Sequence, residues 1–125
     1  MRILLDTHVF LWALAGSAAL KVPARRIIES ADKVYISAAS IWEIAIKTRL
    51  GKIDADPDEL VAAIAASGFD ELPVRASHAA GVALLPMYHA DPFDRLLIAQ
   101  ALAEPLKLLT ADALLVQYSD VVVLI

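Results

Sequence analysis

The sequence predicts an α/β protein with a central, mostly parallel sheet of four to five strands flanked by helices. Short apolar runs alternate along the chain with stretches of helical periodicity, the pattern of strands joined by crossover helices. Glycines and prolines fall between these runs, where helices and strands start and stop. With 125 residues, of which 59% are hydrophobic, the chain can build one full core. We therefore expect a single domain over residues 1–125.

Five short apolar runs are interpreted as strands. The first, RILLD, has the apolar character of a buried strand, and LKLLT has a similar pattern. The third, FDELPV, is the weakest and is either a short strand or an extended segment. The runs cover residues 2–6, 34–37, 69–74, 106–110 and 120–125.

Glycine and proline delimit the helices predicted in the first half of the chain. Glycine adopts the left-handed conformation that commonly ends a helix, and proline fits the first turn. Gly16 and Gly51 each follow a helical stretch, and Pro23 lies near the start of another. These helices are expected over residues 7–15, about 17–31 and 38–50.

The second half carries the same signals. Pro57 and the Asp91–Pro92 pair open helices, whereas Gly68 and Pro86 follow helix ends. We expect helices over residues 57–67, 75–85 and 93–104, a short helix over 111–118, and a loop over 87–91.

Composition narrows the class of protein. The absence of cysteine excludes disulfides and thiolate metal sites. The first residues resemble a signal peptide, but Asp6 and His8 interrupt the apolar run, and no stretch reaches the ~20 apolar residues of a membrane span. We therefore expect a cytoplasmic protein with no membrane association. The large apolar fraction also predicts exposed hydrophobic surface, as in a homodimer.

Four acidic residues, Asp6, Glu43, Asp94 and Asp112, carry the functional prediction. Three lie close to the end of an apolar run, and Glu43 lies inside an apolar helical stretch. Structural roles compete with function: Asp6 suits a helix N-cap, Asp94 suits a first helical turn, and Asp112 suits the first turn after Thr110, which can itself cap. Lys47 lies one turn after Glu43 and could form an ion pair with it. On a helix surface such a pair stabilises the helix by only ~0.2–0.5 kcal/mol.

Taken together, the four acids predict a metal site. In a parallel sheet the strands bring their C-terminal ends to one edge, where ligands bind. Carboxylates converging there would repel one another unless a cation compensated them. Magnesium or manganese, which prefer oxygen ligands, are the natural occupants, and a bound cation would offset the net charge of −4 near a nucleic acid.

Other polar residues are candidates for supporting roles. Thr110 could place its hydroxyl near the metal or cap a helix, and Ser40 could orient Glu43, touch phosphate or cap a helix. Arg95 could face a phosphate group or be an ordinary first-turn arginine. The three histidines lack zinc spacing, so we expect them at the surface or behind the ligands.

Four segments resemble the PIN-domain family: LLDTHVFLWAL, ISAASIWEIAIKTRLGKI, HADPFDRLLIAQA and LLTADALL. The likeness is greatest to the VapC-type toxins of bacterial type II toxin–antitoxin modules, and it spans the chain from Arg2 to about Ser119. It implies a PIN-like three-layer fold and an Mg²⁺- or Mn²⁺-dependent endoribonuclease that cleaves RNA with a metal-activated water.

The resemblance also implies residue roles and partners. Asp6, Glu43, Asp94 and Asp112 match the family's four acids, and Thr110 matches its usual Ser/Thr. A VapB- or Phd-like antitoxin and a homodimer are expected. The alternatives from other classes are a receiver-like signalling domain and a non-catalytic protein-interaction module.

Overall fold

A five-stranded sheet in the order β3-β2-β1-β4-β5, with every pairing parallel, forms the centre of the molecule. The computed structural model describes all 125 residues. The strands are β1 (Arg2–Leu5), β2 (Lys33–Ser37), β3 (Asp70–Leu72), β4 (Lys107–Thr110) and β5 (Val122–Leu124). The predicted α/β class and parallel sheet are confirmed. The strand order differs from the 2-1-3-4-5 order of flavodoxin-like receiver domains, so the receiver alternative is wrong.

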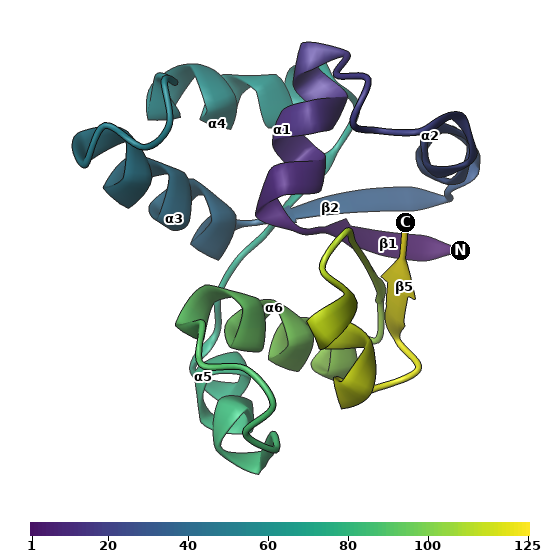
Figure 1. Cartoon of the computed structure of the whole chain (residues 1–125), viewed down its shortest axis with the longest axis vertical. Coiled ribbons are helices and arrows are strands. Elements are labelled where there is room, and N and C mark those ends of the chain that lie inside the picture. Colours follow the sequence, from purple (N-terminus) through teal and green to yellow (C-terminus); the bar gives the residue numbers. More distant parts are fainter.

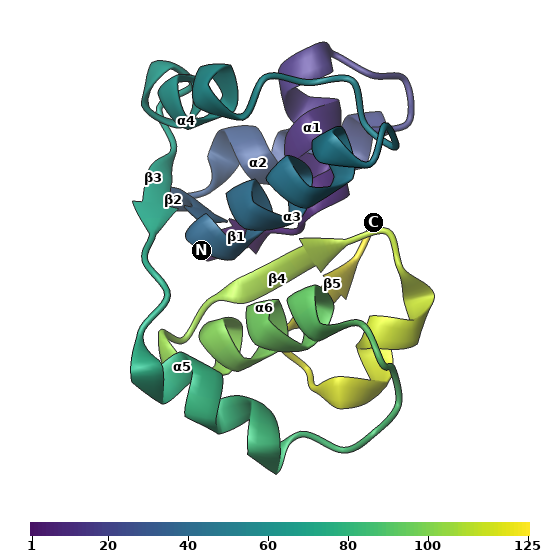
Figure 2. The same cartoon turned by 90° about the vertical axis from the view of Figure 1, so that its left-hand side faces the viewer.

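Helices cover both faces of the sheet, giving three layers (Figures 1 and 2). One face is covered by α1 (Thr7–Ala15), α2 (Val22–Ser30), α3 (Ala38–Arg49) and α4 (Pro57–Ala66). On the other face lie α6 (Pro92–Ala103) and the 3-10 helix η2 (Ala113–Tyr118), with α5 (Ala76–Gly81) and η1 (Val82–Leu84) beside α6.

The central strand β1 joins the two cores. Successive side chains of a strand point to opposite faces, so Ile3 and Leu5 enter the core under α1, and Leu4 enters the core under α6. All three side chains are fully buried. Burial of such side chains contributes roughly 1.5–3 kcal/mol each, which fixes the register of β1 and thereby the position of the residue that follows it.

Two helices begin or end differently from the prediction. The helix expected from residue 17 begins at Val22, because Ser17 accepts a hydrogen bond from the backbone N–H of Ala19 and holds a turn instead. The helix expected over 75–85 is split into α5 and η1, which follow one another directly. The segment 111–118 is a short helix as predicted, of the 3-10 type.

The strand ends meet as the parallel topology requires. The backbone N–H of Asp6 donates to the carbonyl of Leu109 over 3.0 Å, which places the end of β1 beside the end of β4. None of the helices combines the length and the hydropathy that crossing a bilayer requires.

Candidate metal centre

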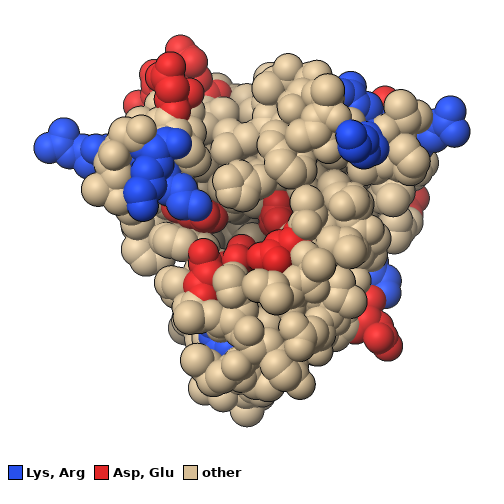
Figure 3. Space-filling view, in the orientation of Figure 1, with Lys and Arg blue, Asp and Glu red and all other residues tan.

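A cavity of about 290 Å³ opens at the C-terminal edge of the sheet, and no hydrophobic residue lines it. Acidic side chains surround this hollow near the middle of the face seen in Figure 3. The four predicted acids all lie in its wall, together with residues that the sequence did not single out as ligands. The lining consists of Asp6, Thr7, His8, Glu43, Lys47, His89, Asp91, Asp94 and Asp112.

Asp6 both caps α1 and lines the acidic cavity. It is the N-cap of α1, where its Oδ1 accepts from the backbone N–H of Val9 over 2.9 Å. Its Oδ2 accepts from the hydroxyl of Thr110 over 2.5 Å, and the Thr110 hydroxyl oxygen in turn accepts from the backbone N–H of Asp112 over 3.0 Å. Burial raises the pKa of Asp6, and the hydrogen bonds from Thr110 and Val9 oppose that rise.

Glu43 is held on α3 by two short contacts. It is only 4% exposed, and its Oε1 accepts from the hydroxyl of Thr7 over 2.6 Å. Its Oε2 lies 2.6 Å from Nζ of Lys47, so the ion pair considered as a structural alternative is present. That hydrogen bond with Glu43 raises the pKa of Lys47. Ser40 contacts Thr7, with hydroxyl oxygens 3.0 Å apart, and thus supports Glu43 indirectly.

Asp94 lies in the first turn of α6 but is not its N-cap. The N-cap of α6 is Asp91, whose Oδ1 accepts from the backbone N–H groups of Phe93 and Asp94 over 2.8 and 3.1 Å. The Asp94 carboxylate is therefore free to face the cavity. Burial, followed by the negative charge of Asp91, raises the pKa of Asp94 to about 6, and the hydrogen bond from His89 opposes this rise.

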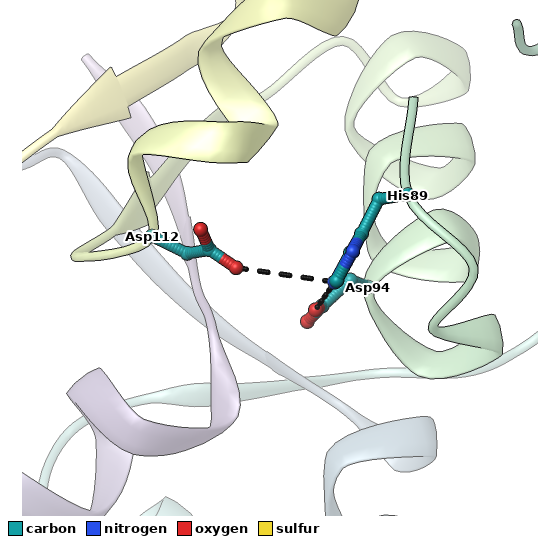
Figure 4. Close-up of side chains that lie close together, drawn as sticks. All are labelled: His89, Asp94 and Asp112. Carbon is teal, nitrogen blue, oxygen red and sulfur yellow. Dashed lines mark hydrogen bonds and ion pairs between the residues drawn. The ribbon is translucent and has the colours of Figure 1, made fainter. Parts of the chain in front are cut away.

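Asp112 and His89 close the other side of the cavity (Figure 4). Asp112 is the N-cap of η2, where its Oδ1 accepts from the backbone N–H of Leu114 over 2.9 Å, one place earlier than the first-turn position expected for it. Its Oδ2 remains turned toward His89 Nε2, 3.9 Å away, and the same nitrogen lies 3.1 Å from Asp94 Oδ2. One ligand atom from each of these three residues lies within 4.8 Å of the others, a spacing that suits a shared metal ion.

Arg95 lies away from the cavity, so the prediction that it faces phosphate is wrong. Its side chain is nearly buried, at 8% exposed for the residue. The guanidinium donates to the carbonyls of Pro86 and Val82 over 2.8 and 3.2 Å, and to the hydroxyl of Tyr118 over 3.2 Å. Arginine offers five donors in a fixed geometry, which suits several carbonyls of an irregular segment. Arg95 therefore holds the loop before α6.

The histidines divide between three environments. His8 is exposed at the cavity, in line with the surface expectation. His78 is fully buried elsewhere, with Nε2 2.6 Å from Glu104 and Nδ1 accepting from the backbone N–H of Arg75. His89 lies among the acids. Only its place two residues before Asp91 in the motif could have signalled this.

A larger cavity, of about 530 Å³, lies at the opposite ends of β2 and β3. Most of its charged groups already have partners: Lys33 pairs with Asp70 over 3.2 Å, and Asp32 pairs with the amino terminus. Arg25 donates to the carbonyls of Leu20 and Ser17 over 2.8 and 2.7 Å. This cavity mixes acidic and basic side chains, whereas the smaller cavity gathers five carboxylates around one lysine, so the acidic cavity is the better candidate site.

Comparison with known proteins identifies the class of domain. The PIN domain family model matches residues 3–120, and the chain belongs to the PIN-domain family. The chain is 32% identical over 112 residues to "Ribonuclease VapC22" of Mycobacterium tuberculosis (strain ATCC 25618 / H37Rv), covering 88% of this chain and 86% of that protein. The resemblance drawn from the four sequence segments is confirmed.

The fold is shared with a solved structure described as a toxin-antitoxin complex from Klebsiella pneumoniae. The TM-score is 0.69, and the match covers 97% of this chain and 95% of that one. At 20% sequence identity this likeness concerns the fold alone. The PIN-like three-layer architecture predicted from the sequence is confirmed.

Proposed function

We propose that this chain is a metal-dependent endoribonuclease, the toxin of a type II toxin–antitoxin system, with Asp6, Glu43, Asp94 and Asp112 as its metal-binding and catalytic residues. The observation that carries the proposal is the convergence of these carboxylates on one polar cavity. The relative named as a ribonuclease and the family membership support the same reaction class.

The donor set fits a divalent cation. Five carboxylates line the cavity, and Lys47 is the one lysine or arginine among the lining residues. Burial, and to a smaller extent the neighbouring carboxylates, raise the pKa values of Asp6 and Asp94. Oxygen-rich sites of this kind suit Mg²⁺ or Mn²⁺. The residues that would hold the ion are Asp6, Glu43, Asp94 and Asp112.

The residues around the acids have defined tasks. A bound divalent cation lowers the pKa of a coordinated water and offsets charge on a phosphate. Thr110 orients Asp6, and Thr7 orients Glu43, so neither carboxylate can rotate freely. Lys47, part-buried beside Glu43, is positioned to contact a phosphate oxygen of the RNA.

Partners follow from the same proposal. The proposed substrate is RNA, and a VapB- or Phd-like antitoxin is the proposed partner that neutralises the toxin in the cytoplasm. Three exposed apolar side chains form a stripe suited to a homodimer interface: Trp42 and Ile46 on α3 and Leu50, the C-cap of that helix, at four-residue intervals. A monomer at micromolar concentration in light scattering would contradict the dimer.

The decisive experiment is cleavage of RNA by the purified protein with EDTA, Mg²⁺ or Mn²⁺. We expect cleavage only with a divalent ion, products with 5′-phosphate and 3′-hydroxyl ends, and none with Asp6→Asn. Sequencing the 5′ ends of RNAs after induced expression, again with Asp6→Asn as the control, then identifies the target. Cleavage by a well-folded Asp6→Asn protein at the wild-type rate would overturn the assignment.

The interaction-module alternative has one observation in its favour: Asp6 and Asp112 do cap helices, and Glu43 does pair with Lys47. A metal titration separates the two. A nuclease is stabilised against thermal unfolding by Mn²⁺, and the stabilisation is lost in Asp6→Asn. An interaction module shows neither effect.

A further inference from the structure

His89 presents one nitrogen to two candidate metal ligands. Its Nε2 lies 3.1 Å from Asp94 Oδ2 and 3.9 Å from Asp112 Oδ2 (Figure 4). Around a first-row divalent ion with bonds of about 2.0–2.2 Å, neighbouring ligand atoms lie roughly 3–4 Å apart. Both distances from His89 Nε2 fall in this range, and the ligand atoms of all three residues lie within 4.8 Å of one another.

Hydrogen bonds from Tyr118 and Arg95 hold the backbone of the segment that carries His89. Tyr118 donates its hydroxyl to the backbone carbonyl of His89 over 3.2 Å and accepts a hydrogen bond from Arg95. Arg95 also bonds the carbonyl of Pro86, three residues before His89. The edge of the Tyr88 ring packs against Tyr118, with centroids 5.2 Å apart. This clamp of Arg95 and Tyr118 holds the imidazole at the cavity.

An imidazole ligand changes which metal ions a carboxylate site prefers. Carboxylates and water suit Mg²⁺, whereas imidazole suits the transition metals and adds little for Mg²⁺. A site with one imidazole among its carboxylates discriminates between these ions more than a site of carboxylates alone.

We propose that His89 is a nitrogen ligand to the divalent ion held by Asp94 and Asp112, and that it shifts the preference of the site from Mg²⁺ toward Mn²⁺ and later first-row ions. The inference rests on the proposed metal-dependent function and adds a ligand to it. Arg95 and Tyr118 are positioning residues for this ligand.

The test is electron spin-echo spectroscopy of the full chain loaded with Mn²⁺. We expect modulation from a bound imidazole nitrogen in the wild-type protein, altered when its histidines carry ¹⁵N, and absent in His89→Gln. In calorimetric titrations His89→Gln should weaken Mn²⁺ binding by about tenfold, with a much smaller change for Mg²⁺. Because the labelled wild-type protein carries the spectroscopic test, a poorly folded variant does not leave the question open.

His8→Gln is the matched control. His8 also lines the cavity, but its ring lies near Trp12, with centroids 6.3 Å apart, and makes no hydrogen bond to an acid. We expect His8→Gln to keep both the nitrogen modulation and the Mn²⁺ preference. Mn²⁺ that binds without nitrogen modulation would overturn the role of His89 and leave the proposed nuclease standing. Failure of any divalent ion to bind would overturn both.

Discussion

Lys47 Nζ lies 2.6 Å from Glu43 Oε2 across one turn of α3, inside a cavity that otherwise gathers carboxylates. The lysine therefore compensates Glu43 in the metal-free protein and competes with any cation for the same oxygen. A surface pair of this spacing contributes little, but Glu43 is nearly buried, so the partner matters here.

Lys47→Met tests both effects of the lysine, the stabilisation of Glu43 and the competition with a cation. Without divalent ions the variant should lose roughly 1–3 kcal/mol of unfolding free energy, because a buried carboxylate is left without its partner. Metal affinity should rise, since the competitor is gone. Thermal unfolding in EDTA and in Mn²⁺ measures both. A Mn²⁺-induced shift equal to that of the wild-type protein would contradict the competition.

Asp94→Asn should change the pH dependence of stability. The pKa of Asp94 is about 6 in the folded protein, against an ordinary value of 3.8. Between about pH 4 and 6 the folded protein therefore holds a proton that the unfolded chain has released, and unfolding free energy falls as pH rises through this window. In EDTA the wild-type melting temperature should fall relative to that of Asp94→Asn by several degrees as pH rises from 4 to 7.

The same variant tests function separately from stability. Because Asn cannot supply an anionic ligand, Asp94→Asn should abolish RNA cleavage while the fold survives or is even stabilised without metal. Circular dichroism establishes the fold, and a cleavage assay in Mn²⁺ establishes activity. Wild-type activity in a well-folded Asp94→Asn protein would refute the role of this acid.

Thr110→Val removes a buried donor from Asp6. Thr110 is fully buried and donates to Asp6 Oδ2 over 2.5 Å. Loss of a hydrogen bond to a charged group should cost about 1.5–3 kcal/mol, and the pKa of Asp6 should rise further, because that hydrogen bond lowers it. The lower limb of the pH–rate profile for cleavage should move to higher pH. Thr110→Ser keeps the hydroxyl and should leave the profile unchanged.

Gln100→Leu should weaken the contact between α6, which carries Asp94, and the start of α3, which carries Glu43. Ser37 is the N-cap of α3. Ser37 donates to Gln100 Oε1 over 2.6 Å, and Gln100 donates to the carbonyl of Pro73 over 3.3 Å. Both side chains are fully buried, so we expect a loss of about 1–3 kcal/mol. In a double-mutant cycle with Ser37→Ala in urea, the two losses should not add, because each variant removes the same bond. Strict additivity would show that the pair is uncoupled.

The sequence predicted the sheet and the gathering of acids because both depend on pattern. The apolar run before Asp6 indicated a buried strand, and parallel topology then places the residues after β1 and β4 at one edge. Glu43 was identifiable because an acid within an apolar helix needs a partner. That the four acids act as metal ligands stays a prediction.

Long-range contacts and one local turn explain what the sequence did not predict. Arg95 has the same place in the motif whether it faces phosphate or the carbonyls of Pro86 and Val82, and only the path of the loop decides. The late start of α2 depends on the Ser17 turn, a competition between two locally acceptable conformations. His89 joins the acids because Tyr118, far along the chain, holds its backbone.

The convergence of the four acids from β1, α3, α6 and η2 has a bearing on the lifetime of the protein in a cell. These side chains are scattered along the unfolded polypeptide, which therefore cannot chelate an ion as the proposed site of the native state would. Nearly all the free energy of chelation then counts toward folding, about 2.7 kcal/mol when free ion is a hundredfold above its dissociation constant. Ion supply would thus govern how rarely the chain opens to proteases, so starvation for divalent ions should shorten its half-life as well as silence it.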